Sequence, residues 1–343
     1  MTAGRLPALI ELDRQSSEPQ KPYGIITVDC SSPYEYDDGI AVSRITDASG
    51  ELYNVSIFAA DTSRHYLDED IVKHVLRKRE SRYHDLETGE QAYDPMLGDD
   101  LTQSLHFIKG SVRKAMFLSF VVGEDHPPSD IEIGFGNVEV ARNLSYSEFT
   151  RKARLRGTYK PHKKAASYIV QHLSPQNVRS KDTLFRDPLL IPDAMATRKG
   201  AAANSAFMIG GGHLIAKMMQ DEGHLAIYRV HDVDDTSYSD FLSPRMARFS
   251  LKPGPHHALG LDPYLRPFSP LRRAEDFIML GILRARHDDR PMGTRDQKLA
   301  KAAVQCLNNA IITQLPSDEL RLSAVDLGLS TGRRSKAKLQ AVS

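Results

Sequence analysis

Residues 27–40 read Thr-Val-Asp-Cys-Ser-Ser-Pro-Tyr-Glu-Tyr-Asp-Asp-Gly-Ile, an acidic stretch between two apolar runs. Both runs are rich in Ile and Val, as β-strands are. Pro33 and two serines lie between them and favour a loop. The stretch therefore predicts two strands joined by a loop that carries four acids within ten residues: Asp29, Glu35, Asp37 and Asp38.

This carboxylate cluster is suited to a divalent cation. Hard cations such as Mg²⁺ and Mn²⁺ prefer oxygen ligands. A metal pair about 3.5–4 Å apart activates water and stabilises the leaving oxygen during attack on phosphorus. Solvated acids in a loop, or an acid that caps a turn, would show the same spacing, so spacing alone leaves both interpretations open.

The rest of the chain divides into a strand-rich half and a helix-rich half. Short Ile- and Val-rich runs predict strands at residues 24–29, 39–45, 52–61, 115–122 and 131–140. Apolar residues recur at helical spacing at residues 163–173, 202–221, 276–286 and 296–315. This order predicts an α+β domain, with a β-rich N-terminal half packed on a helix-rich C-terminal half.

Composition limits the class of protein. The 45 basic and 44 acidic residues give a formal net charge of +1, so any attraction to a polyanion must be local. Cys30 and Cys306 are too few for a disulfide scaffold, and no apolar run reaches the length of a membrane span. The first residues do not resemble a secretory signal. We therefore expect a cytoplasmic protein without a membrane partner.

The two ends of the chain differ from its middle. Residues 1–23 are polar and contain prolines, which predicts a partly ordered lead-in. Residues 316–343 carry Arg333, Arg334 and two lysines close together, which predicts a mobile basic tail. Residues 24–315 contain no linker rich in Gly or Ser, so we expect one catalytic domain there.

Several different motifs follow one another along the chain. Asp-x5-Glu-x-Asp-Asp is followed by Ile-Phe-Ala-Ala-Asp at residues 57–61 and by Pro-Met-Leu at residues 95–97. Pro-His-His-Ala-Leu-Gly-Leu-Asp-Pro-Tyr at residues 255–264 precedes Ser-Pro-Leu-Arg-Arg-Ala-Glu-Asp at residues 269–276. Together they resemble the catalytic domain of the RNB, or ribonuclease II-type, exoribonucleases over roughly residues 24–290.

The resemblance implies a role for each motif residue. Asp29, Glu35, Asp37 and Asp38 fall at the acidic positions that hold Mg²⁺ or Mn²⁺ and the scissile phosphate. Asp37 and Arg272 fall at catalytic positions, and a planar guanidinium suits a phosphate because it donates two hydrogen bonds. Tyr83 and Tyr146 fall beside the 3′-terminal nucleotides, whose bases aromatic rings can stack. From the residues alone, either tyrosine could instead be a half-buried strand residue.

The implied activity is 3′-to-5′ hydrolysis of short or single-stranded RNA, which releases nucleoside 5′-monophosphates. Three departures from the family pattern leave alternatives open. Glu35 replaces an Asp, Ser205 and Ala206 replace acids, and we expect the chain to lack the family's flanking oligonucleotide-binding barrels, because few residues lie on either side of the predicted domain. The alternatives are hydrolysis of an ester or amide in a small molecule or an aminoacyl-tRNA, and a non-catalytic RNA-binding pseudo-enzyme. Protein partners stay unknown.

Three other features have simpler interpretations. Gly210–Gly212 is costly inside a helix and predicts a helix break or a close approach of the backbone to a ligand. The thirteen histidines lack the spacing of a zinc site, and His256 is expected to be a packed loop residue. Arg273 and Asp276 are expected to form a structural ion pair at a helix start.

Overall fold

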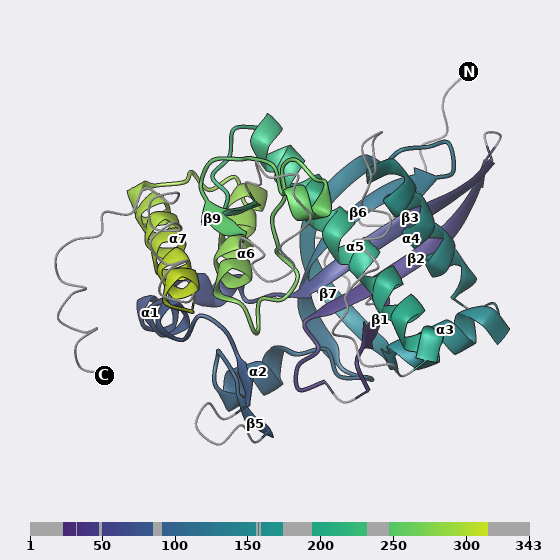
Figure 1. The fold of residues 1–343 in the computed structure, drawn as a ribbon, viewed down its shortest axis with the longest axis horizontal. Helices are drawn as coiled ribbons and strands as arrows, with labels where there is room; N and C mark the ends of the chain where they lie inside the picture. Colours follow the sequence, from purple (N-terminus) through teal and green to yellow (C-terminus); the bar gives the residue numbers. More distant parts are fainter. Residues whose placement is uncertain are drawn as a thin grey trace, which may run out of the picture.

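Five strands of the N-terminal half close into a barrel (Figure 1). The computed structural model describes residues 23–31, 33–47, 50–84, 91–155, 157, 159–173, 194–231 and 247–314. The barrel strands are β1 (Tyr23–Asp29), β2 (Asp38–Asp47), β3 (Gly50–Ala60), β6 (Val112–Gly123) and β7 (Ser129–Ser145). Neighbours along this order pair antiparallel, and β7 returns to pair parallel with β1. All five predicted strands are confirmed.

The register brings the acidic loop to one end of the barrel. Because β1 and β7 run parallel, they end together, with Asp29 opposite Ser145. β2 begins at Asp38, which lies opposite Ala59 near the end of β3. The backbone of Ala60 donates a hydrogen bond to the carbonyl of Asp37, at 2.9 Å. The loop between β1 and β2 is thereby fixed at the end of the barrel where β1, β3 and β7 finish.

Helices pack on two sides of this barrel (Figure 1). One group is α3 (Tyr146–Leu155), α4 (Lys160–Leu173) and α5 (Ala194–Asp221). The other is α1 (Glu69–Lys78), α6 (Ala274–His287) and α7 (Thr294–Gln314). The four predicted helices correspond to α4 to α7 and are confirmed, whereas α1 and α3 were not anticipated. The smaller elements are α2 (Asp99–Leu105), η1 (Ser63–Leu67), η3 (His257–Leu259), β4 (Arg82–His84), β5 (Gln91–Asp94), β8 (Tyr228–Val230) and β9 (Arg248–Ser250).

α5 runs without interruption through Gly210–Gly212, so the predicted helix break is wrong. A Cβ at Gly210 would overlap the Ile169 side chain of α4, and a Cβ at Gly212 would overlap the Leu265 carbonyl oxygen. The glycines therefore allow close approach, but the approach is to other parts of the protein. Burial against neighbouring elements offsets the low helix propensity of glycine.

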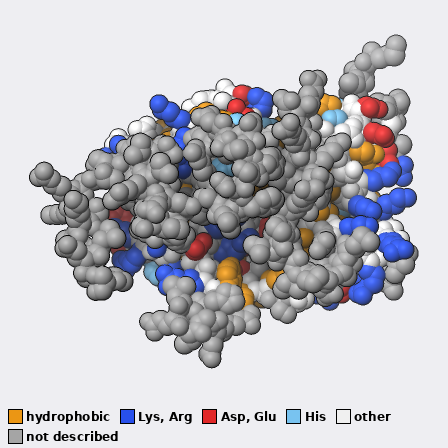
Figure 2. Space-filling view, in the orientation of Figure 1, with side chains coloured by type: hydrophobic (Ala, Val, Ile, Leu, Met, Phe, Trp, Pro, Cys, Tyr) orange, Lys and Arg blue, Asp and Glu red, His pale blue; other side chains and the backbone are white. Residues whose placement is uncertain are grey.

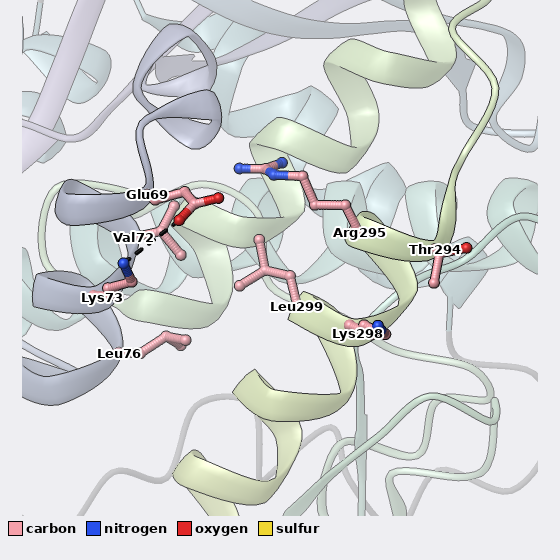
Figure 3. A pocket seen from close by; sticks show the side chains of 8 residues that line it. All are labelled: Glu69, Val72, Lys73, Leu76, Thr294, Arg295, Lys298 and Leu299. Carbon is pink, nitrogen blue, oxygen red and sulfur yellow. Dashed lines mark hydrogen bonds and ion pairs between the residues drawn. The ribbon is translucent and has the colours of Figure 1, made fainter.

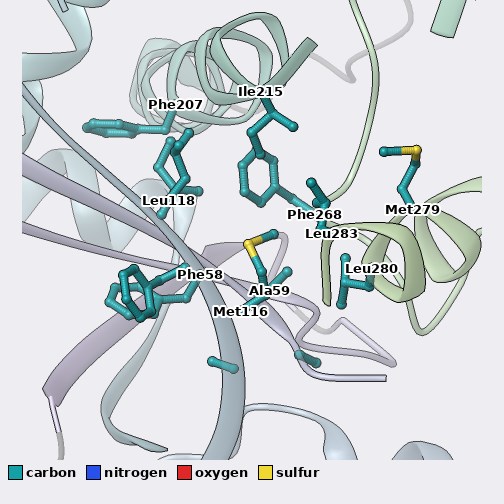
Figure 4. Packing of buried hydrophobic residues seen from close by; sticks show 14 of the residues in the cluster. Phe58, Ala59, Met116, Leu118, Phe207, Ile215, Phe268, Met279, Leu280 and Leu283 are labelled. Atoms are coloured by element: carbon teal, nitrogen blue, oxygen red, sulfur yellow. The ribbon is translucent and has the colours of Figure 1, made fainter. Parts of the chain in front are cut away.

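The barrel and both helical groups share one hydrophobic core (Figure 4). Leu118 of β6 lies near Phe207 and Ile215 of α5, and Phe268 extends this cluster toward α6, whereas Phe58 of β3 packs with Phe117 on the other face of the strands. This confirms the predicted packing of a β-rich half on a helix-rich half. Phe268 is buried, and the backbone of Leu271 just after it donates a hydrogen bond to Asp37, so this segment is held against the acidic loop.

The predicted lead-in and basic tail fall almost entirely outside the described residues, so both stay predictions. Within the described part of the chain, no helix combines the length and apolar character needed to cross a membrane.

Candidate active site

Two hollows in the described structure differ in their lining. A groove of about 490 Å³ lies between α1 and α7, and apolar side chains such as Val72 and Leu299 line it (Figure 3). No predicted site residue lies there. A smaller hollow of about 330 Å³, here called the acid pocket, lies at the barrel end and is lined by residues that include Asp29, Asp38, Tyr146, Asn204, Arg266 and Arg272. The acid pocket is therefore the candidate site.

The strand register explains why Asp29 and Tyr146 share this pocket. Asp29 is the last residue of β1, and Tyr146 follows the last residue of the parallel strand β7. Burial and the negative charge of Asp29 both raise the pKa of Tyr146. Its hydroxyl therefore stays protonated at neutral pH and can donate a hydrogen bond.

Asp29 and Asp38 have unsatisfied oxygens. The Oδ2 atoms of both residues are buried and lack a hydrogen-bond partner. Burial, and then the charge of Asp38, raise the pKa of Asp29 to about 8. Burial also raises the pKa of Asp38 to about 6, against the attraction of Arg272. Two buried like charges repel, so without a cation this pair holds a proton near neutral pH.

The donor set around these two oxygens is suitable for a divalent cation. Carboxylate oxygens are the ligands that Mg²⁺ and Mn²⁺ prefer, and Mg²⁺ usually takes only one or two protein carboxylates besides water and phosphate. Among the described residues, however, no group of three or more His, Cys, Asp or Glu side chains has metal-binding geometry. The residues that fit a cation are therefore Asp29 and Asp38, with the other ligands left to solvent or substrate.

Asp37 is fully engaged with the segment that carries Arg272. Its Oδ1 accepts a hydrogen bond from the backbone of Leu271 at 3.0 Å, and its Oδ2 accepts one from Arg272 Nε at 2.7 Å. The guanidinium of Arg272 also donates to Ser269 Oγ at 2.8 Å. Burial raises the pKa of Asp37 to about 7, against the lowering effect of Arg272. Asp37 thus positions Arg272 at the acid pocket.

Glu35 organises a stack of three tyrosines beside the site. Its carboxylate is 6% exposed and accepts hydrogen bonds from Ser81 Oγ at 2.6 Å and from Tyr83 OH at 2.7 Å. The ring of Tyr34 stacks on that of Tyr93 with centroids 4.6 Å apart, and Tyr83 lies 5.8 Å from Tyr34. Sequence reasoning missed Tyr34 and Tyr93. The position of Tyr34 directly before Glu35 was the available signal.

The predicted site residues thus fall into three places. Asp29, Asp38, Tyr146 and Arg272 line the acid pocket, and Asp37 contacts Arg272. Glu35 and Tyr83 contact each other and are not among the residues that line the pocket. The geometry therefore separates two acids with free oxygens from two that hold protein groups in place.

Asn204 is a site residue that the sequence analysis did not single out. It lies on α5, and its side chain hydrogen-bonds Asp38, while its Oδ1 has no partner. Ser205, at one of the positions where acids were expected, also lines the pocket, whereas Ala206 is buried. A polar pair inside a run of small and apolar residues was the available signal.

The predicted structural roles of Asp276 and His256 are confirmed. Arg273 donates to Asp276 Oδ2 at 2.6 and 3.1 Å, and the same oxygen accepts the backbone N–H of Ser269 at 2.7 Å. His256 is 9% exposed and packs edge-on against Tyr264, with ring centroids 5.3 Å apart. Its burial lowers the pKa to about 3, so the ring is neutral.

Basic side chains gather on the side of the molecule where α3 and α4 lie (Figure 2). Arg151 and Lys163 are exposed there, but Lys164 pairs with Glu51 of β3. His162, in the same run, is buried, and that burial lowers its pKa to about 4. Only part of this run is available to a polyanion.

Among known proteins, the sequence is similar to exoribonuclease 2. No family model matches the chain. Exoribonuclease 2 of Photorhabdus laumondii subsp. laumondii is 22% identical over 324 residues, which cover 76% of this chain and 49% of that protein. The chain thus spans about half the length of this curated relative.

Solved structures share the fold. RNase R of Mycoplasma genitalium, in complex with ribose-methylated single-stranded RNA, matches with a TM-score of 0.65 at 14% identity, over 89% of this chain and 55% of that one. Yeast Ssd1, described as a pseudonuclease, matches with a TM-score of 0.63 at 13% identity, over 83% of this chain and 42% of that one. The same fold therefore occurs in a nuclease and in a pseudonuclease.

Proposed function

This chain is an RNB-type domain, and on that premise we propose that it hydrolyses phosphodiester bonds at the 3′ end of short or single-stranded RNA and releases nucleoside 5′-monophosphates. The observation that carries the proposal is the pair of unpartnered oxygens on Asp29 and Asp38, which line one pocket with Arg272. Buried polar atoms are normally hydrogen-bonded, so orphaned oxygens in a pocket point to a ligand.

Asp29 and Asp38 are the residues that would hold Mg²⁺ or Mn²⁺. A cation bound there supplies an activated water and offsets charge on the phosphate. Arg272 has five N–H donors, and Asp37 and Ser269 occupy two of them. The remaining donors are available to a phosphate oxygen, and the ion pair with Asp37 keeps the guanidinium in position.

The tyrosine stack supports recognition of bases without sequence preference. Tyr34, Tyr83 and Tyr93 present aromatic rings beside Glu35, and every base has a face that can stack on such a ring. The hydrogen bond from Tyr83 to Glu35 fixes the orientation of one ring. In this proposal Glu35 is a positioning residue for the base-binding side chains.

The test is a labelled single-stranded oligoribonucleotide incubated with the protein and either Mg²⁺ or Mn²⁺. We expect a ladder that shortens from the 3′ end, together with nucleoside 5′-monophosphates. Asp29→Asn should abolish the ladder, whereas Asp125→Asn, which changes an exposed acid outside the site, should leave it intact. An intact substrate at high protein concentration with both metals would overturn the proposal, as would full activity after chelation.

A second candidate is an RNA-binding pseudo-enzyme. It is favoured by the absence, among the described residues, of a cluster of three metal ligands, and by the engagement of Asp37 with Arg272. The fold match to yeast Ssd1 is compatible with it. The same incubation separates the candidates, because a pseudo-enzyme retards the oligonucleotide in a native gel and leaves its length unchanged with either metal.

A further inference from the structure

The acid pocket is lined by charges of both signs, the carboxylates of Asp29 and Asp38 and the guanidiniums of Arg266, Arg272 and Arg273. Asp29 interacts electrostatically with Asp38, Asp37 and Arg272. Asp38 also interacts with Arg273, while Arg266 interacts with Glu275, Asp276 and Tyr264. Since such interactions weaken with distance, Arg273 lies near Asp38 and Asp276, and Arg266 lies near Glu275 and Asp276. We call the part of the lining formed by Arg266 and Arg273 the guanidinium end.

Arg266 has an unused donor at this end. Its side chain is 27% exposed and lines the pocket, and its outer nitrogen pairs with Glu275. Its Nε atom, however, is buried and has no hydrogen-bond partner. An unmade hydrogen bond from a buried charged group is costly, so this donor is positioned for an acceptor that the protein does not itself provide.

Three arginines gather around the guanidinium end. Glu275 interacts with three arginines, Arg229, Arg266 and Arg273, and Asp276 is the other carboxylate in the group. Burial lowers the pKa of Arg229 to about 10, so it stays charged at neutral pH, and its guanidinium lies 4.2 Å from the centre of the Phe249 ring. With Asp38, which also interacts with Arg273, three carboxylates lie near these three cations, so a further anion can bind only through donors that the carboxylates leave unused, such as Arg266 Nε.

We propose that the guanidinium end binds a phosphate monoester on the terminal ribose, so that the preferred RNA ends in a 3′-phosphate. This inference rests on the proposed function. Guanidinium groups bind phosphate oxygens through paired hydrogen bonds, and Ser205 and Tyr264, which both carry a hydroxyl, are among the residues that line the same pocket. A phosphate monoester carries about −1.5 to −2 charge at pH 7, whereas a 3′-hydroxyl carries none.

The pocket's size and charge pattern match one such nucleotide. Its volume of about 330 Å³ lies at the lower end of the range for small-molecule sites. The nucleotide has a phosphodiester on its 5′ side and a phosphate monoester on its 3′ side. In this proposal the first group lies beside Arg272 and the second beside Arg266.

The reaction on this substrate differs from that on RNA with a free 3′-hydroxyl. Water attacks the last phosphodiester phosphorus, the bond from that phosphorus to the upstream 3′-oxygen breaks, and a proton passes to this oxygen. The products are a nucleoside 3′,5′-bisphosphate and an RNA shortened by one residue that ends in a 3′-hydroxyl. Since the shortened RNA lacks the phosphate, the first cleavage is faster than those that follow.

The test compares two labelled oligoribonucleotides of one sequence, one with a 3′-hydroxyl and one with a 3′-phosphate. Their binding to the wild-type protein is measured by fluorescence anisotropy in EDTA, so that no cleavage occurs. We expect the 3′-phosphate form to bind at least about 10-fold more tightly, because it adds a charged group opposite free donors. Equal affinities would overturn the inference without any variant.

Variants then test whether Arg266 causes the tighter binding of RNA that ends in a 3′-phosphate. The double variant R266Q/E275Q removes both members of the ion pair, and it should bind both oligonucleotides equally. Lys301→Gln, which removes an exposed charge on α7, should keep the full preference. A preference that persists in R266Q/E275Q contradicts the assignment.

A competition experiment tests whether the 3′-phosphate of the terminal nucleotide is the group that this end of the pocket binds. A free nucleoside 3′,5′-bisphosphate should displace the labelled RNA at a concentration about 10-fold lower than the 5′-monophosphate, and equal displacement would contradict the inference. Addition of Mg²⁺ separates this inference from the proposed function. Equal binding with cleavage of both RNAs rejects only the inference, whereas tighter binding of the 3′-phosphate form without any cleavage rejects only the proposed function.

Discussion

Asp38 and Asp296 are both buried aspartates with arginines nearby, yet their surroundings differ. Asp296 is 1% exposed and accepts hydrogen bonds from Arg290 at 2.9 and 3.0 Å, from Tyr66 OH at 3.0 Å and from the Gly293 backbone at 3.0 Å. Asp38 is 7% exposed, and its Oδ2 has no partner. Both oxygens of Asp296 are satisfied within the protein, and one oxygen of Asp38 is left to a ligand.

The difference appears in the two pKa values. Burial alone would raise the pKa of Asp296, but the hydrogen bonds from Arg290 and Gly293 lower it below the ordinary value. At Asp38, burial outweighs the attraction of Arg272, and the pKa rises to about 6. A satisfied buried carboxylate stabilises a fold, whereas an unsatisfied one destabilises it and persists at sites where it acts on something else.

The largest expected effect is on cleavage. Asp38→Asn should lower the rate of RNA hydrolysis by about 100-fold or more, since it removes a charged ligand at the cation position. Asp296→Asn should leave the rate per folded molecule within about twofold. Initial rates, corrected for the folded fraction by circular dichroism, check both. Equal losses of hydrolysis rate in Asp38→Asn and Asp296→Asn would show that the two acids do not differ in function.

The next effect is on stability. Asp296→Asn should lower the free energy of unfolding by about 2–3 kcal/mol, because it leaves Arg290 without its carboxylate and removes charged hydrogen bonds. Asp38→Asn should leave it unchanged or raise it. Urea denaturation in EDTA measures both values. A destabilised Asp38→Asn variant would show that this carboxylate contributes to the fold.

The two acids should respond to pH in opposite directions. The raised pKa of Asp38 means that its stabilising contribution is complete below about pH 3.8 and is lost as the pH rises through about 6. In EDTA, the melting temperature of Asp38→Asn should therefore exceed that of the wild type by about 2 °C or more at pH 8, with the gap closing toward pH 4.

Asp296, whose pKa is lowered, contributes stability above its unfolded pKa of about 3.8 and loses it as the pH falls through the folded value. The deficit of Asp296→Asn should therefore be full at pH 7 and shrink at strongly acidic pH. Thermal melts from pH 3 to 8 test both trends together. If the melting temperatures of the two variants changed with pH in the same way, Asp38 and Asp296 would not differ in their electrostatic surroundings as described.

The smallest effect is that of the cation itself. A ligand that binds only the folded state at 100 times its dissociation constant stabilises by about 2.7 kcal/mol, and weaker saturation gives less. Mg²⁺ should therefore raise the melting temperature of the wild type at pH 7.5 by about 1–3 °C, and chelation should reverse the rise. Asp38→Asn should show no rise, and Asp296→Asn should show the full rise.

Much of the fold was predictable because its main elements have regular apolar patterns. The strands of the barrel and helices α4 to α7 fall where runs of Ile and Val or helical spacing indicated them. The elements that were missed, such as α1 and β4, are short and rich in charged residues, so their apolar signal is weak. The helix break predicted at Gly210–Gly212 was wrong because the effect of these glycines on α5 depends on neighbours that are distant in sequence.

The candidate site was predictable only in part. The order of the motifs indicated Asp29, Asp38 and Arg272, which do line one pocket. The contributions of Asn204 and Arg266 were not predictable, because these residues lie more than 160 positions from the acidic loop and enter the pocket only through packing.

By itself, the sequence determined the acidic loop between two strands, the division into a β-rich and a helix-rich half, and the identity of the charged groups. These properties depend on local pattern and residue chemistry. Only the tertiary structure decided that Asp37 and Glu35 hold protein groups while Asp29 and Asp38 keep free oxygens. It also placed Arg266 in the lining of their pocket. The reason is physical: whether a carboxylate or a guanidinium is satisfied depends on donors and acceptors brought from distant parts of the chain, and on the water that packing removes.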